Sequence, residues 1–323
     1  MKKKFILLFF SAGLIFSAFL LISSNKAVES EDQPVVLAYT ASVPVPEEVS
    51  FCGEKISLNR LDMRERFDRE LNTFTYLHST TMMYIKRANR FFPIIEPILK
   101  KNGIPDDFKY LCVIESNLDI RALSTAKAAG LWQFMEGTGK SFGLEIREGV
   151  DERYHIEKAT QAACAYLKSA YVRYGDWVNV AASYNAGMGR ISSEMQKQSV
   201  NSALDLWLVT ETSRYVFRIL AAKEVFSNPS KYGFLLKSED LYPPVGMNYV
   251  EVSNDIPDLA AFALKHGINY MQLKEYNLWL RDTKLTMPKT GGKTYQIAIP
   301  RSEDLYFDKN RIRVHNKAWI GRN

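Results

Sequence analysis

A helical spacing of apolar residues extends through the middle of the chain and constrains its fold most. In residues 64–84, Phe67, Leu71, Phe74 and Leu77 recur at three- and four-residue steps, which places them on one face of a helix. No alternation typical of strands appears before residue 245, so we expect this part to be mainly α-helical. The further helices expected are 87–101, 108–115, 138–142, 156–174, 177–186 and 213–226.

The pattern changes after residue 228. Strand, helix, helix and strand patterns follow one another over 248–253, 255–268, 269–280 and 294–300. This order predicts a small β-α-α-β unit within residues 245–300. The tail that follows, 301–323, is rich in charge and has no clear pattern.

The first residues have the layout of an export signal. Three lysines precede an uncharged run over residues 5–24, a positive region followed by an apolar one. The run approaches the length that spans a bilayer, and no Ala-x-Ala cleavage site follows. Residues 1–27 are therefore predicted to be a signal peptide or an N-terminal anchor, and 28–50 a linker. The rest is expected in the periplasm or on the periplasmic side of the membrane.

Charge and composition argue against several function classes. The 42 basic and 36 acidic residues leave a net charge of +6 without a basic stripe interleaved with aromatics, so nucleic-acid binding is not expected. Cys52, Cys112 and Cys164 are widely spaced and the four histidines are scattered, so no metal or cofactor site is predicted. Because Cys112 and Cys164 lie in apolar helical runs, they are interpreted as buried thiols.

Glu115 lies at the end of the apolar helical stretch YLCVIE. Val113, Ile114 and Leu118 flank it, and apolar surroundings raise the pKa of a carboxyl because they disfavour its charged form. A general acid that works near neutral pH needs a pKa of roughly 6–7. The residues alone leave a second interpretation open, an ordinary solvated glutamate at a helix end.

Three later segments suit a binding groove. Residues 122–135 begin with small residues, which allow a close backbone approach, and end with Trp132 and Gln133 among aromatics. Residues 181–191 end a helix in Tyr-Asn-Ala-Gly, and residues 208–221 place Thr-Glu-Thr before a helical run as a capped start.

These segments together resemble lytic transglycosylases with a soluble-transglycosylase-type, goose-lysozyme-like catalytic domain. The resemblance lies in GIPDDFKYLCVIESNLDIRALSTAKAAGLWQFM, AASYNAGMGRI and TETSRYVFRILA, whose motifs follow the order of that family. It covers about residues 52–235. It implies a mainly α chain with a lysozyme-like helical domain over 51–235.

The resemblance also implies site residues. Glu115 is expected to be the single catalytic acid and base. The Ser124 hydroxyl is expected near the N-acetyl group of the reacting sugar, and the Gln133 amide beside Glu115 in the cleft. A structural interpretation of Ser124 and Gln133, as residues that cap turns, stays open.

Four further residues are expected in the cleft by the same resemblance. The Tyr184 phenol is expected to point at the catalytic carboxylate with Asn185 beside it, and Glu211 and Tyr215 to hold the substrate. Tyr184 as a core residue stays open. Trp132 is interpreted chiefly as a packing residue.

The C-terminal unit resembles a lysin motif, a small glycan-binding module. Its segment VSNDIP lacks the glycine of the usual strand-Gly-Asp start, so a packing role is the alternative to glycan binding.

The implied reaction cleaves the β-1,4 bond between N-acetylmuramic acid and N-acetylglucosamine in peptidoglycan without water, leaving 1,6-anhydro-N-acetylmuramic acid ends. Two alternatives stay open. One is a lysozyme-type hydrolase, in which a second carboxylate such as Glu136 or Asp151 would hold a water opposite Glu115. The other is a non-catalytic peptidoglycan-binding protein.

Overall fold

The computed structural model describes residues 41–289 and 291–321. The predicted signal peptide or anchor, 1–27, and most of the predicted linker lie outside the described residues. Among the residues that are described, no helix is both long and apolar enough to cross a membrane.

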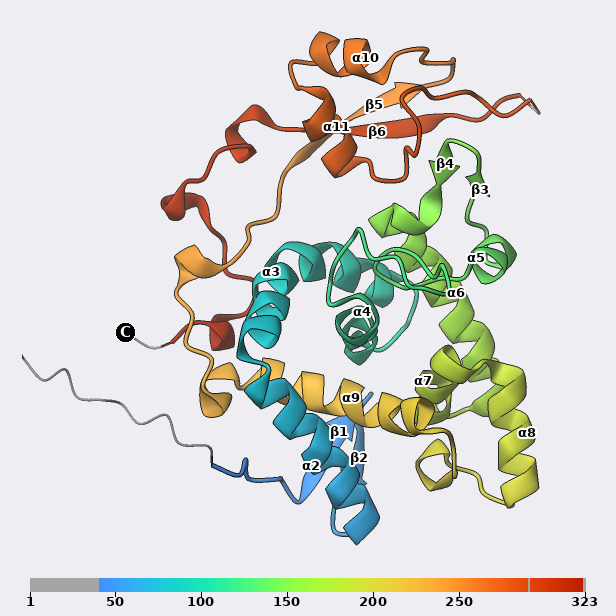
Figure 1. Cartoon of the computed structure of the whole chain (residues 1–323), viewed down its shortest axis with the longest axis vertical. Coiled ribbons are helices and arrows are strands. Elements are labelled where there is room, and N and C mark those ends of the chain that lie inside the picture. Colours follow the sequence, from blue (N-terminus) through green and yellow to red (C-terminus); the bar gives the residue numbers. More distant parts are fainter. Residues whose placement is uncertain (1–40, 290, 322–323) are drawn as a thin grey trace, which may run out of the picture. The chain divides into compact units, whose positions relative to one another are not determined.

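The part before residue 228 is α-helical, as the apolar spacing predicts (Figure 1). Its helices are α2 (Leu61–Tyr76), α3 (His78–Lys101), α4 (Lys109–Ser116), α5 (Glu136–Ser141), α6 (Ile156–Tyr174), α7 (Trp177–Ala186), α8 (Met188–Gln198) and α9 (Thr210–Ser227). The bounds predicted for α6 and α7 are confirmed. The single helix expected over 64–84 is wrong, because the backbone leaves the helical conformation at Leu77. Helix α8 was not predicted, because its side chains are mostly polar and only Ile191 is buried.

Helix α4 lies inside this helical part, near the centre of the view in Figure 1. It packs against α3 and α9. Its side chains Leu111, Cys112 and Val113 have no exposed surface. The helix is enclosed by the core, which explains why it is apolar around its circumference. The same packing holds a polar side chain at the end of the helix in position.

A β-hairpin precedes α2 and differs from the expected linker. Strands β1 (Glu48–Phe51) and β2 (Glu54–Ser57) pair antiparallel. Val43 and Val49 are buried in the core of the helical part. Strands of four residues are too short for an alternating pattern to stand out in the sequence, so this segment was interpreted as irregular.

The C-terminal unit has the predicted β-α-α-β order. Strand β5 (Met247–Val252) pairs antiparallel with β6 (Tyr295–Pro300), and α10 (Leu259–Lys265) and α11 (Tyr270–Tyr276) lie between them in sequence. The helices begin at Asp258 and Asn269, whose side chains accept hydrogen bonds from backbone N–H groups of the first turn. Buried Asn277 bonds both the N–H and the carbonyl of Ala298, which fixes α11 to β6.

The C-terminal unit is joined to the helical part by backbone hydrogen bonds. The short hairpin of β3 (Ile146–Arg147) and β4 (Val150–Asp151) extends to it, because Asp151 N donates to Trp279 O and Arg281 N donates to Gly149 O, each at 2.9 Å. Val150 and Tyr154 belong to the same buried cluster as the core of the unit. Residues 43–323 accordingly form one compact unit.

The tail 301–323, for which the sequence offered no pattern, packs against the helical core. Trp319 is 2% exposed, and its ring N–H donates to the carbonyl of Phe226 at 2.9 Å. Leu236 and Ile320 form a parallel bridge. The tail therefore covers the α3 and α9 surfaces and contributes to the core.

Candidate active site

Glu115 is held at a turn that α3 fixes. Asn117 and Leu118 have φ angles of 58° and 52°, in the left-handed region, so α4 ends immediately after Glu115. The Tyr84 hydroxyl donates to Asn117 Oδ1 at 2.6 Å, and Arg87 Nη1 donates to the Asn117 carbonyl at 2.9 Å. These contacts fix the turn after α4 and therefore the direction in which the Glu115 carboxylate points.

The Glu115 carboxylate accepts a hydrogen bond from Tyr215 on α9. The Tyr215 hydroxyl lies 2.5 Å from Glu115 Oε1, and its ring is 2% exposed. One helical turn further along α9, Arg218 Nη2 donates to the Ile114 carbonyl at 2.9 Å. Helix α9 thus contacts both the side chain and the adjacent backbone of the Glu115 turn.

Burial raises the pKa of Glu115 to about 6, while the hydrogen bond from Tyr215 and the nearby charge of Arg218 act in the opposite direction. Glu211 raises the pKa of Glu115 slightly further. The position of Glu115 at the C-terminal end of α4 also disfavours a negative charge. A carboxyl in this state can give up a proton near neutral pH and take one back.

The loop over residues 122–135 is held by hydrogen bonds between its own residues. The Ser124 hydroxyl accepts from Ala128 N at 2.9 Å. Gln133 has a φ of 48°, and its amide nitrogen donates to the Gly130 carbonyl at 2.8 Å. Both side chains therefore form hydrogen bonds within this loop, and their expected roles toward the substrate stay predictions.

Gly130 allows this loop to approach the chain beneath it. Its φ is +74°, and a Cβ there would lie 2.0 Å from the carbonyl oxygen of Arg153. Arg153, itself buried, donates to the carbonyls of Lys127 and Phe134 at 2.8 and 3.1 Å. Glycine is needed where backbone meets backbone this closely.

Both carboxylates considered for a hydrolase are occupied elsewhere. Asp151 is 8% exposed and forms an ion pair of 2.7 Å with Arg153. Glu136 lies on the exposed side of α5 and pairs with Lys140 at 2.6 Å.

Tyr184 does not donate to Glu115, which differs from the expectation. Its hydroxyl donates to the Trp132 carbonyl at 2.8 Å, so it ties α7 to the 122–135 loop. The carboxylate is still near, because its charge adds to burial in raising the pKa of Tyr184. The hydrogen bond to the Glu115 carboxylate comes from Tyr215, which the resemblance expects to hold substrate.

The last two predicted substrate residues lie on α7 and α9. Asn185 is half-buried at the end of α7, and Glu211 is exposed in the first turn of α9. Trp132 is fully buried and donates to Thr160 Oγ1 at 2.9 Å, which confirms its packing role.

Sequence reasoning missed Arg218 and Tyr84. Arg218 stands three residues after Tyr215, so both lie on one face of α9, and that spacing was the signal available. Tyr84 had no local signal, because its partner Asn117 is 33 residues away.

The thiols of the described chain are free, and Cys112 and Cys164 are buried as predicted. Burial raises the pKa of the Cys112 thiol well above its ordinary value and that of Cys164 to about 11. Within the described ranges, no three His, Cys, Asp or Glu side chains gather closely enough to hold a metal ion.

Comparison with known families matches two parts of the chain. Residues 92–205 match the transglycosylase SLT domain, and residues 248–303 match the soluble lytic transglycosylase C-terminal LysM-like domain. The chain therefore contains an SLT transglycosylase domain and a LysM-like domain. Helix α4 and the Glu115 turn lie within the SLT domain, and β5, α10, α11 and β6 within the LysM-like domain.

The similar proteins include transglycosylases of bacteria and a phage. Membrane-bound lytic murein transglycosylase D of Escherichia coli K12 is 28% identical over 254 residues, which is 76% of this chain and 55% of that protein. The chain therefore spans about half the length of this relative. A peptidoglycan transglycosylase of Escherichia phage T7 is 26% identical over 175 residues, or 51% of this chain and 13% of that protein.

Two solved structures show partial similarity. They are an inactive mutant of the lytic transglycosylase Slt of Pseudomonas aeruginosa and the 70 kDa soluble lytic transglycosylase of Escherichia coli, with identities of 24% and 21%. The TM-score is 0.36 in both comparisons, which cover 42% of this chain and 23% of the other.

Proposed function

We propose that the protein is a lytic transglycosylase that cleaves peptidoglycan strands, with Glu115 as its single catalytic acid and base. One observation carries the proposal. Glu115 is a largely enclosed carboxyl whose pKa burial raises to about 6, at the end of an apolar helix inside an SLT domain. A carboxyl in this state is partly protonated near neutral pH, as a general acid requires.

The first step proposed for Glu115 is protonation of the oxygen that links N-acetylmuramic acid to N-acetylglucosamine. The 2-acetamido group of the muramic residue then stabilises the positive charge that develops at C1. The Tyr215 hydrogen bond and the Arg218 charge favour the carboxylate that remains, because both lower the Glu115 pKa.

The second step uses the same carboxylate as a base. Glu115 removes the proton of the muramic C6 hydroxyl, and that oxygen bonds to C1. The product end is 1,6-anhydro-N-acetylmuramic acid and no water is consumed, so the reaction is that of a carbon-oxygen lyase. One group serves as acid and then as base, which needs the intermediate pKa described above.

The pairing of the two carboxylates considered for a hydrolase supports the lyase. A hydrolase needs a second carboxylate that holds water across the scissile bond. Asp151 is paired with Arg153 inside the core, and Glu136 is paired with Lys140. A protein that only binds the cell wall would not need the raised pKa of Glu115 or its contacts with α9.

We further propose that residues 1–27 direct export and that the protein acts on the wall from the periplasmic side. The LysM-like domain supports contact with glycan strands outside the reacting bond. The proposed substrate residues besides Glu115 follow it in the motif order of the family. They are Ser124, Gln133, Tyr184, Asn185, Glu211 and Tyr215.

The test compares the unsubstituted protein with Glu115→Gln on purified peptidoglycan. General acid–base catalysis is typically worth about 10²–10⁴-fold, and loss of one group that serves both steps should reach or exceed the upper value. Mass spectrometry should find products one water lighter than those of a lysozyme. Reducing-end products would assign the hydrolase instead.

Glu136→Gln is the matched control. It makes the same change at an exposed carboxylate that pairs only with Lys140, so its turnover should equal that of the unsubstituted protein. If Glu115→Gln retained its turnover, the proposed mechanism would be wrong.

A further inference from the structure

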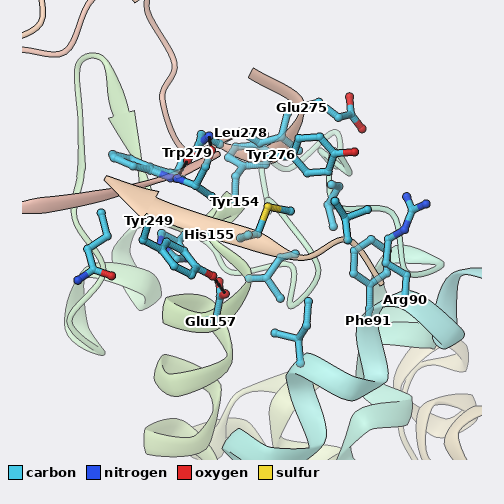
Figure 2. Close-up of a pocket in the computed structure, with 18 residues that line it drawn as sticks. Arg90, Phe91, Tyr154, His155, Glu157, Tyr249, Glu275, Tyr276, Leu278 and Trp279 are labelled. Carbon is cyan, nitrogen blue, oxygen red and sulfur yellow. Dashed lines mark hydrogen bonds and ion pairs between the residues drawn. The ribbon is translucent and has the colours of Figure 1, made fainter. Parts of the chain in front are cut away.

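A cavity of about 230 Å³ lies where the SLT domain meets the LysM-like domain (Figure 2). One wall comes from α3 and the start of α6, and the other from β5, β6 and the end of α11. Ile120, five residues beyond Glu115, also lines it, but Glu115 does not. The cavity is therefore separate from the carboxyl of the candidate active site and close to the turn that carries it.

Aromatic side chains form much of the lining. Trp279 is held between His155 and Tyr295, with interplanar angles of 28° and 23°, so it is fixed in position. Tyr249 is 52% exposed, which leaves one of its faces free at the mouth. Figure 2 shows Trp279 and Tyr249 toward one end of the cavity and Arg90 toward the other.

The two acidic groups of the lining already have partners. Glu157 accepts from the Tyr249 hydroxyl at 3.3 Å and lies 3.1 Å from His155 Nδ1. Glu275 forms an ion pair with Arg121. The cavity therefore has no spare carboxylate at the Arg90 end to balance a cation.

Arg90 has no acidic partner within ion-pair distance among the described residues. Its Nε donates to the Pro243 carbonyl at 3.0 Å, and its guanidinium lies over the Tyr242 ring, 5.5 Å from the centroid. Burial lowers its pKa from the ordinary value, because the cation has lost part of its water. A half-buried guanidinium is normally paired, and its Nη groups match the two oxygens of a carboxylate.

The lining thus combines a cation at one end with aromatic side chains at the other. The apolar C–H face of a sugar ring packs on an aromatic ring, whose face is the negative part of its quadrupole. The volume lies below the range of about 300–1,000 Å³ of sites for larger ligands, so it suits one ring and not an oligosaccharide or a peptide.

We propose that this cavity binds a single N-acetylmuramic acid residue that carries no peptide, with its free lactyl carboxylate on Arg90 and its sugar ring on Tyr249. The inference rests on the proposed function for the choice of sugar. In intact peptidoglycan the lactyl carboxylate is amide-linked to peptide, so the site would take the free sugar, or a strand end whose terminal muramic residue has lost its peptide.

The test measures binding of monosaccharides to the full chain by methyl NMR of its methionines. Met247 lines the cavity and reports occupancy, and Met247→Leu assigns its resonance. N-acetylmuramic acid should bind about tenfold more tightly than N-acetylglucosamine, which lacks the carboxylate, as expected of one charge-assisted hydrogen bond. N-acetylmuramoyl dipeptide should bind more weakly than the free acid.

Two substitutions and one control variant test which residues cause the preference for N-acetylmuramic acid. Arg90→Gln should abolish the preference for N-acetylmuramic acid, whereas Arg69→Gln, an equal charge change at an exposed residue of α2, should preserve it. Tyr249→Ala should weaken both sugars alike, and it is safe for folding because the side chain is half exposed.

Three results would overturn the proposal: an unmoved Met247 resonance, equal binding of the two sugars, or a preference that survives Arg90→Gln. Tighter binding of the dipeptide would assign the site to peptide instead. Failure of this proposal can be told apart from failure of the proposed function, because formation of anhydro products is measured separately. If anhydro products form but the sugar preference is absent, only the proposed binding site is rejected. If the preference is present but no anhydro products form, only the proposed reaction is rejected.

Discussion

The hydroxyl of Tyr215 should set the pH range in which Glu115 can act as an acid. It donates to Glu115 Oε1 at 2.5 Å and lowers the Glu115 pKa against the effect of burial. A hydrogen bond to a charged group is worth about 1.5–3 kcal/mol, and one pKa unit corresponds to about 1.4 kcal/mol. Tyr215→Phe should therefore raise the Glu115 pKa from about 6 by about one unit.

The assay is the pH dependence of kcat/KM on a soluble peptidoglycan oligosaccharide. If Glu115 must be protonated to start the reaction, activity falls as pH rises through its pKa. In Tyr215→Phe that fall should come about one pH unit higher. The maximal rate should drop less than in Glu115→Gln, since the acid itself remains.

Tyr184→Phe is the matched control. It removes a hydroxyl whose hydrogen bond goes to Trp132, so the position of the fall should not move. A shift in Tyr184→Phe with none in Tyr215→Phe would refute the reasoning. It would also restore the assignment that family resemblance implied for Tyr184.

Two further predictions concern stability. Because the Glu115 pKa is about 6 when folded and ordinarily 4.5, the folded state keeps a proton that the unfolded chain releases, and stability falls by up to about 2 kcal/mol as pH rises across that window. Urea titrations of Glu115→Gln should lack this fall, and an equal fall in the variant would show that other groups cause it. Trp319→Ala should lower the free energy of unfolding by about 3–5 kcal/mol, since its ring is buried against Phe92 and Phe226. Trp207→Ala, whose ring is 89% exposed, should change it by less than about 0.5 kcal/mol, and equal losses would mean that the tail adds nothing to the core.

The sequence by itself determined what depends on neighbouring residues. The three- and four-residue spacing predicted the helices of the SLT domain other than α8, and the period-two segments predicted β5 and β6. The apolar run YLCVIE predicted that Glu115 would lie in surroundings that raise its pKa, which the burial of α4 now explains. Side-chain periodicity is a local property, so it can be recognised without knowledge of the fold.

Only the tertiary structure decided which groups meet. The resemblance directed the Tyr184 phenol at Glu115, whereas the crossing of α9 over α4 brings the Tyr215 hydroxyl to the carboxylate from 100 residues away. Arg121, in the turn after α4, pairs with Glu275 at the end of α11, although the two residues lie far apart in the sequence. The tail shows no local pattern because Trp319 is buried by α3 and α9 and not by its own neighbours. Contacts of this kind depend on how helices cross and pack, and no spacing within one segment encodes that.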